Sequence, residues 1–571
     1  MCGILFSLSA SGDPPSPHHV SIISQRGPDS TRTHVVTIGS QTLNFTSSLL
    51  SVRGTEPTPQ PLVDQSSGSV LCWNGEAWRI RGESLAEGAN DTREVFDLLL
   101  NAPNGRLDEV LHQLDGEFAF VYYDAPAGVF WYGRDWAGRR SLVFRKTEGA
   151  LEVASVGDGQ GSPWEEVEAG GVWRFEVTGG YAEWLTTRAS GEPIYNVPSL
   201  NLELPDETND TPLTIDSPVV DSLHDALLES LRLRVRDIQL PPDHDLQARH
   251  LPKDAEGNDV RIAILFSGGV DCTTLARIAH EVLPPDEPVD LLNVAFENPR
   301  VVAARNKPPP KPPKAKKSKH PKNNSEEAPV EEEIGAEEVI SSAVTESDPY
   351  AICPDRGTGL SSFEDLKTSC PTRRWRFVPI NIPYADVLAH RANVINLMHP
   401  HNTEMDLSIA LAFYFAARGQ ADNYITPARI LLSGLGADEL LGGYTRHATA
   451  HRRGGYPALL EELNLDFQRL GKRNLGRDDR VGTNWAKEMR YPFLDEKVVA
   501  WAMAAPVTSK CPFGSEPGAT ENGKKVLRLL AQKLGLPKAA GEAKRAVQFG
   551  AKTAKMSIES RKMKGTDGLC P

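Results

Sequence analysis

The spacing of hydrophobic and polar positions divides the chain into two halves with different periodicities. Up to about residue 184, short apolar runs such as residues 118–123 and 129–132 alternate with glycine-containing turns, which is typical of β-strands. From about residue 216 leucines recur at helical spacing, and an apolar run at residues 262–266 leads into a glycine turn and another helical pattern. The pattern therefore predicts a strand-rich α+β or all-β domain followed by an α/β domain.

Three segments lack any such periodicity. Residues 190–212 carry Pro, Asn and Asp and are expected to cross between the domains. Residues 299–349 hold seven Lys between positions 307 and 322 and seven Glu between 326 and 338, so they cannot bury enough apolar surface to fold and predict a disordered insertion. A nuclear-import or nucleic-acid patch, or a contact for a protein partner, is the alternative interpretation. Residues 556–571 are expected to form a flexible tail.

Composition narrows the class of protein. The chain has 571 residues, 40% hydrophobic and 24% charged, which is typical of a globular protein with more than one domain. A net charge of -14 argues against a protein that coats nucleic acid or anionic lipid, and no apolar stretch approaches the ~18 residues of a membrane span. Seven scattered cysteines without a CxxC pair predict neither a disulfide framework nor a zinc site, so we expect a cytoplasmic, reducing location.

A cysteine at position two is the first candidate for chemistry. Removal of Met1 would leave Cys2 with both a thiol and the free α-amine, whose reference pKa of about 7.7 to 8.0 allows it to accept the thiol proton. An inert thiol is the alternative for an isolated cysteine. The motifs that follow in order are residues 1–4 (MCGI), 25–29 (QRGPD), 73–76 (WNGE), 90–92 (NDT), 115–120 (DGEFAF) and 133–135 (GRD).

This series resembles a class II glutamine amidotransferase domain over roughly residues 1–187. The resemblance implies an Ntn-type αββα sandwich in which Cys2 attacks the side-chain amide of glutamine and releases ammonia. It also implies that the Asn74 side chain and the Gly75 N–H form an oxyanion hole, and that Glu76 and Asp91 hold the α-amino group of glutamine. A plain hairpin turn is the alternative interpretation of the Asn-Gly-Glu segment alone.

One position departs from that family. Its arginine for the glutamine carboxylate lies eleven residues before a Gln-Pro pair, and counting back from Gln60 reaches Leu49. Arg53 is the nearby candidate, although in an extended segment the two positions lie about 13 Å apart at 3.3 Å per residue. We expect either that Arg53 substitutes or that glutamine binds poorly.

The apolar run at 262–266 leads into Ser267, Gly268, Gly269, Val270 and Asp271, followed by a helical pattern. A glycine turn at a helix start is an anion site, because backbone N–H groups and the positive end of the helix dipole face the ligand. The motif is not a Walker loop, and it resembles the loop of ATP pyrophosphatases, which cleave ATP between the α- and β-phosphates. A plain strand-to-helix turn is the alternative.

Further motifs follow at residues 430–444 (ILLSGLGADELLGGY), 490–495 (RYPFLD), 524–528 (KKVLR) and 544–550 (KRAVQFG). Together with the loop, this set resembles the asparagine synthetase domain over about residues 216–555, after a linker at 188–215. The resemblance implies that ATP is bound, that Asp271 and Asp438 hold Mg²⁺, and that Lys524 stabilises charge at the α-phosphate. The ATP-binding residues that the resemblance implies are Phe266, Ser267, Gly268, Gly269, Asp271, Cys272, Val294, Ser433 and Gly434.

Two further substitutions separate the chain from a standard synthetase. Cys272 stands where the family has Ser, and Leu435 stands where the family has the Glu expected to take a proton from ammonia. The chain is thus most similar to the asparagine synthetase domain-containing proteins. The resemblance implies a glutamine- and ATP-dependent ligase that adenylates aspartate or a similar small carboxylate and converts it to an amide. The alternatives are a catalytically weakened protein that binds partners, and an adenylating enzyme with another carboxylate or nucleophile.

Overall fold

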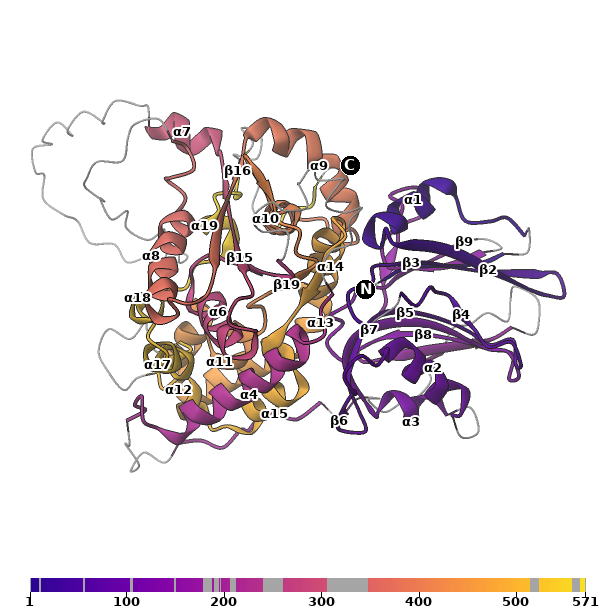
Figure 1. The fold of residues 1–571 in the computed structure, drawn as a ribbon, viewed down its shortest axis with the longest axis horizontal. Coiled ribbons are helices and arrows are strands. Elements are labelled where there is room, and N and C mark those ends of the chain that lie inside the picture. Colours follow the sequence, from indigo (N-terminus) through magenta and orange to yellow (C-terminus); the bar gives the residue numbers. More distant parts are fainter. Residues whose placement is uncertain are drawn as a thin grey trace, which may run out of the picture.

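The computed structural model describes residues 2–9, 12–54, 57–102, 106–147, 150–177, 187–188, 195, 197–205, 212–239, 260–305, 348–513, 523–556 and 565–569. Two antiparallel sheets face each other in the N-terminal half (Figure 1). The first sheet has the order β11 (Glu165–Glu166), β9 (Val143–Thr147), β10 (Ala150–Ala154), β1 (Cys2–Ser9), β3 (Gln41–Leu49) and β2 (Ser30–Ile38). The second has the order β13 (Thr187–Arg188), β12 (Val172–Glu176), β8 (Val129–Arg134), β7 (Leu114–Asp124), β5 (Val70–Ile80) and β4 (Leu62–Val63), and β6 (Glu83–Ser84) pairs with β5.

The sandwich is held together by apolar side chains between the sheets. Ile4, Phe6 and Leu8 alternate along β1 and are fully buried, as the two-residue period of a strand requires. Phe6 stacks on Phe130 of the other sheet with ring centroids 4.0 Å apart. Helix α1 (Pro17–Arg26) covers the first sheet, and α2 (Asp91–Leu100) and α3 (Leu107–Leu111) cover the second. The predicted αββα sandwich is confirmed.

The C-terminal half is built on one parallel sheet. Its order is β16 (Trp375–Ile382), β15 (Val289–Phe296), β14 (Ile262–Leu265), β19 (Ile430–Leu432) and β20 (Glu488–Arg490), and every neighbouring pair is parallel. All eight residues of β15 are buried, as expected for a strand covered on both faces. Because the strands are parallel, their carboxyl ends meet at one edge, where ligands bind in open α/β sheets.

Helices surround this sheet on both sides (Figure 1). They are α4 (Pro218–Val235), α6 (Val270–Val282), α7 (Pro299–Arg305), α8 (Pro354–Ser369), α9 (Tyr384–Met398), α10 (Glu404–Arg418), α11 (Ala437–Leu441), α12 (Thr445–Gln468), α13 (Leu470–Arg473), α14 (Leu475–Thr483), α15 (Glu496–Ala504), α16 (Val507–Lys510), α17 (Lys525–Lys533), α18 (Pro537–Gly541) and α19 (Val547–Gly550), with a 3₁₀ turn η3 (Pro492–Leu494) and a hairpin of β17 (Gln420–Ala421) and β18 (Tyr424–Ile425). None of the helices in the described ranges combines the length and apolar character that a membrane crossing needs.

Two predicted segment assignments need correction. Residues 299–305, assigned to the disordered insertion, form helix α7, whose start at Pro299 suits the first turn of a helix; residues 306–347 lie outside the described residues. The predicted tail is partly ordered, because the backbone at 565–569 bonds to the start of α10: Glu404 N–H donates to Asp567 O at 3.2 Å, and Met405 N–H to Gly565 O at 2.9 Å. These carbonyls satisfy N–H groups that the first turn of a helix leaves free.

Candidate functional site

The predicted phosphate loop lies at the carboxyl end of β14, where the chain turns into α6. Gly268 has φ +83°, and a Cβ atom there would lie 2.5 Å from the Gly359 N and Thr358 O atoms. Only glycine therefore fits the turn. Gly269 is the N-cap of α6, so the free N–H groups of the first helical turn face the space beyond the strand.

The neighbouring strand β19 ends in a similar loop. The Ser433 N–H donates to the Arg490 carbonyl at 2.9 Å, which ties this loop to β20. Gly436 has φ +98°, and a Cβ atom there would lie 2.5 Å from Leu494 Cδ2. The loop then enters α11, whose first turn carries Asp438.

Asp271 and Asp438 face one another across a lysine. Lys524 Nζ lies 2.8 Å from Asp271 Oδ1 and 2.9 Å from Asp438 Oδ1, and Lys544 Nζ lies 2.6 Å from Asp438 Oδ2. Burial opposes ionisation of Asp438, but the two lysines outweigh it and hold the pKa of Asp438 well below its usual range. The same carboxylates raise the pKa of buried Lys524. Asp438 and Lys524 therefore carry opposite charges at neutral pH.

These two loops and the cluster open into one cavity of about 400 Å³, within the range of small-molecule sites. The predicted residues that line it are Phe266, Ser267, Gly269, Asp271, Cys272, Val294, Ser433, Gly434, Asp438 and Lys524; Gly268 lies in the same loop. These predicted residues come from four separate segments of the chain, which meet at the carboxyl edge of the parallel sheet. Further charged and polar lining residues, to which sequence reasoning gave no role, are Asp355, Tyr444, Arg446, Asn474, Arg477, Asp478, Lys544 and Arg545.

The two substitutions in this half also lie on the cavity wall. Cys272 Sγ donates to the Gly269 carbonyl at 3.3 Å, and burial raises the pKa of the Cys272 thiol. Leu435 brings an apolar side chain to the wall where an acid was expected. The structure therefore contains no carboxylate at position 435 to take a proton.

The N-terminal candidates lie on three elements of the sandwich. Asn74, Gly75 and Glu76 follow one another on the buried strand β5, and the Cβ direction of Gly75 points directly into the backbone of β7. Residue 2 begins β1 with its backbone opposite Leu49 of β3, and the Cys2 side chain lies outside the described part of the structure. Asp91 opens α2 and accepts from Trp73 Nε1 at 3.0 Å and from the Ala77 N–H at 3.1 Å.

A second, much smaller cavity lies between these residues. Its wall includes Leu49, Arg53, Gly75, Glu76 and Asp91, and its volume is about 30 Å³. Arg53 Nη1 lies 3.4 Å from Glu76 Oε2. Burial, with Asp91 nearby, raises the pKa of Glu76 to about 7, and burial also raises the pKa of Asp91. Leu49 and Arg53 thus reach the same cavity despite their separation along the chain.

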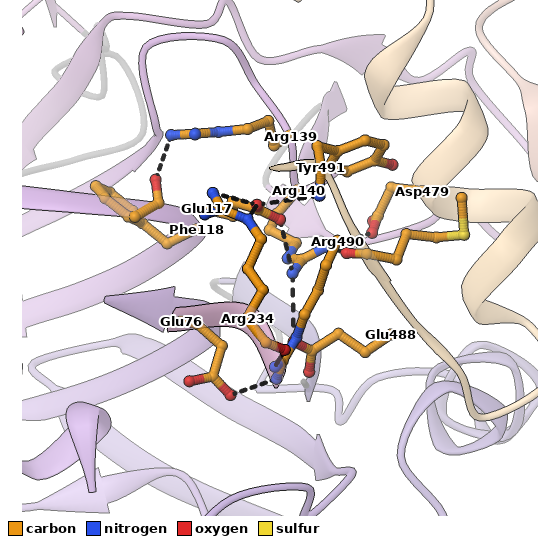
Figure 2. A network of polar contacts seen from close by, with 12 residues as sticks. Glu76, Glu117, Phe118, Arg139, Arg140, Arg234, Asp479, Glu488, Arg490 and Tyr491 are labelled. Carbon is orange, nitrogen blue, oxygen red and sulfur yellow. Dashed lines mark hydrogen bonds and ion pairs between the residues drawn. The ribbon is translucent and has the colours of Figure 1, made fainter. Parts of the chain in front are cut away.

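A buried network of charged side chains joins the two halves (Figure 2). Arg490 of β20 lies 3.4 Å from Glu76 of β5 and 2.7 Å from Glu488. Glu117 of β7 accepts from Arg234 Nε of α4 at 2.9 Å and lies 3.3 Å from Arg140 Nη2. All of these side chains except Glu76, which is 4% exposed, are fully buried. The small cavity is therefore connected through Glu76 and Arg490 to the Ser433 loop of the large one.

Comparison with known proteins agrees with this architecture. Residues 1–159 match the model of the glutamine amidotransferase domain, and residues 452–565 match that of asparagine synthase. The human asparagine synthetase domain-containing protein 1 is 31% identical over 635 residues, covering 97% of this chain and 95% of the relative. A Saccharomyces cerevisiae asparagine synthetase domain-containing protein is 31% identical over 568 residues, covering 96% and 90%. A putative glutamine-hydrolysing asparagine synthetase of Methanocaldococcus jannaschii is 39% identical over 106 residues, 19% of each chain.

The chain combines an antiparallel sandwich with a parallel sheet that has a cavity at its carboxyl edge. Together with the two domain matches, this defines the architecture of a two-domain glutamine amidotransferase of the asparagine synthetase type. The near full-length similarity is more specific than that class. The chain belongs to the family of asparagine synthetase domain-containing proteins.

Proposed function

We propose that the chain is a glutamine- and ATP-dependent ligase that converts aspartate or a similar small carboxylate to its amide. The observation that carries this proposal is the large cavity, in which ten residues expected for an ATP pyrophosphatase site line one surface. The loop after β14 offers the free N–H groups of α6 to phosphate, and Lys524 offers a positive charge.

In this proposal a carboxylate oxygen of the acceptor attacks the α-phosphorus of ATP, and pyrophosphate leaves. The pyrophosphate would lie against the Ser267 to Asp271 loop, and Lys524 would balance the charge that develops on the α-phosphate. Ammonia would come from glutamine in the N-terminal half, where Cys2 is the proposed nucleophile and Asn74 and Gly75 the oxyanion donors. Glu76 and Asp91 would hold the ammonium group of glutamine.

The donor set fits a divalent cation. Asp271 and Asp438 provide two carboxylates that face the same point, and Lys524 Nζ lies between them at 2.8 and 2.9 Å, where positive charge is stabilised. Mg²⁺ prefers one or two carboxylates together with phosphate oxygens and waters. When bound, the ion would neutralise charge on the departing pyrophosphate.

A second candidate function is ATP-dependent adenylation with a nucleophile other than glutamine-derived ammonia. The geometry at Glu76 favours it, because Arg53 Nη1 lies 3.4 Å from Glu76 Oε2 and so already pairs with a carboxylate that would otherwise hold the ammonium group of glutamine. We also propose a cytoplasmic location, which is supported by five buried cysteines in the described ranges that form no disulfide: Cys72, Cys272, Cys353, Cys370 and Cys511.

Pyrophosphate release by the full chain tests the proposal. Purified protein with ATP and Mg²⁺ is offered a panel of small carboxylates, each with ammonium chloride, with glutamine or with no nitrogen source, and amide products are identified by mass spectrometry. We expect aspartate or a close analogue to support pyrophosphate release, and Cys2→Ser to abolish the glutamine-dependent product while the ammonium-dependent product remains. Release without any amide supports the second candidate. No release with any carboxylate contradicts both and favours the partner-binding alternative.

A further inference from the structure

Helix α14 lies between the N-terminal half and the large cavity, and its two sides have different roles. On one side Asp479 Oδ2 accepts from the Ser141 N–H at 3.0 Å and from Arg26 Nη2 at 2.9 Å, both in the N-terminal half. On the other side Arg477 and Asp478 line the cavity. The helix therefore contacts the N-terminal half on one side and the large cavity on the other.

Asp478 has one carboxylate oxygen held and one free. Arg477 Nε and Nη2 both lie 2.9 Å from Asp478 Oδ1. Oδ2 is buried and has no hydrogen-bond partner in the described structure, and the residue is only 1% exposed. A buried oxygen without a partner is costly unless a ligand supplies one. Asp478 thus lines the cavity with one carboxylate oxygen anchored by Arg477 and the other buried without a partner.

Other charged and titratable groups lie near Asp478. Arg477 also donates from Nη1 to Asp406 Oδ1 of α10 at 2.6 Å, and His401 Nδ1 lies 3.9 Å from the same Asp406 oxygen. Tyr491, after β20, lies close enough to feel the charge of Asp478. Burial is the dominant effect on Asp478 and raises its pKa, which makes the carboxylate a better proton acceptor than an exposed one.

Leu435 lies on the wall of the same cavity and cannot accept a proton. We propose that Asp478 is the catalytic base for the incoming ammonia in this chain and takes the part that an acid at position 435 would otherwise play. The inference rests on the proposed amide synthesis. The sequence motifs suggested no role for Asp478.

The step balances without any further reactant. The ammonia nitrogen attacks the carbonyl carbon of the acyl adenylate, and a C–N bond forms. The bond from that carbon to the adenylate oxygen breaks, and AMP leaves with the electron pair. One proton moves from nitrogen to Asp478 Oδ2, so the products are the amide, AMP and a protonated carboxyl group that returns its proton to solvent.

Asp478→Asn tests the assignment, because it keeps the shape and removes the proton acceptor. At saturating ammonium and acceptor, we expect amide formation to fall by ~10²- to 10⁴-fold, the usual contribution of a general base, while the first turnover of pyrophosphate release is retained. Asp290→Asn is the matched control: Asp290 is another buried acid, bonded by the Tyr424 hydroxyl at 2.7 Å, and it does not line the cavity. This control should leave amide formation within about twofold of wild type, as expected for a site away from the chemistry.

A change of nucleophile separates a base from a merely structural residue. Hydroxylamine adducts lose their proton more readily than ammonia adducts, so Asp478→Asn should lose much less hydroxamate formation than amide formation. Adding Leu435→Glu to Asp478→Asn should restore part of the ammonium-dependent rate. Equal losses with both nucleophiles, or an unchanged amide rate in a variant that still binds ATP, would overturn the role of Asp478. A wild type that releases no pyrophosphate instead contradicts the proposed function itself.

Discussion

Arg234→Met tests how much the buried charges contribute to holding the two halves together. In the structure Arg234 Nε donates to Glu117 Oε1 of the sandwich at 2.9 Å, and Nη1 donates to Asp495 Oδ2 at 2.8 Å. Its guanidinium lies 5.0 Å from the ring centroid of Trp78. Methionine retains most of the apolar stem but removes the positive charge, so two buried carboxylates each lose a partner.

The remaining contacts set the size of the effect. Glu117 keeps Arg140 at 3.3 Å and the Tyr491 N–H at 3.2 Å, and Asp495 keeps Arg79 at 3.3 Å. Removing one partner of a buried ion pair usually costs about 3–5 kcal/mol, and the surviving partners place this case near the lower end. We therefore expect the free energy of unfolding to fall by about 3 kcal/mol. At about 1.4 kcal/mol per factor of ten, this raises the equilibrium constant for unfolding more than a hundredfold.

Urea unfolding followed by tryptophan fluorescence measures this change, since Trp73 and Trp78 lie on β5 beside the network. The matched control is Arg232→Met, two residues earlier on the same helix at an exposed position, which should change stability by less than about 0.5 kcal/mol. Because the chain has two domains, the transition is fitted with an intermediate where the data require one. If Arg234→Met were as stable as the control, the network would contribute nothing to the association of the halves.

Two further predictions follow from individual side chains. Lys524→Met should lower the rate of pyrophosphate release by about 10²- to 10³-fold, because it removes the positive charge that lies 2.8 Å from Asp271 and 2.9 Å from Asp438. The control is Lys533→Met, at the exposed end of α17. An equal loss of rate in both variants would refute this role of Lys524. Glutamine binding should strengthen as pH rises from about 6 to 8, because the pKa of Glu76 is raised to about 7 and only its ionised form attracts the substrate ammonium group. Glutaminase assays of KM across this range check the sign, and a KM that does not change with pH contradicts it.

Much of the architecture follows from local pattern alone. The apolar run from Ile4 to Phe6, followed by Leu8, is enough to predict a buried strand, as is the apolar run Ile262–Leu265 of β14. Gly268 and the helix start that follows predict an anion loop, because the turn needs a positive φ and the helix supplies free N–H groups. These features depend on neighbours within a few residues, so the linear sequence contains them.

The charged segments were harder to delimit. The composition of residues 299–349 predicts a segment without an apolar core, yet Pro299–Arg305 forms helix α7. A short helix needs only a few residues, and the charge content of the segment does not show where that helix ends. The predicted flexible tail likewise pairs its backbone with the start of α10 at residues 565–569. Backbone hydrogen bonds to a distant helix cannot be predicted from the pattern of side chains.

Only the tertiary structure decided which polar groups meet. Glu76 and Arg490 are 414 positions apart and lie 3.4 Å from each other, and Arg53 pairs with Glu76 where the motif alone assigned it to a substrate carboxylate. Asp478 stands beside Asp479 in the sequence, but one faces the cavity and the other the N-terminal half. The sequence by itself determines the two folds and the loop that suits phosphate, because backbone geometry and burial are local. The partners of each buried charge are determined by packing between elements, because a carboxylate without a partner is too costly to bury and its partner can come from anywhere in the chain.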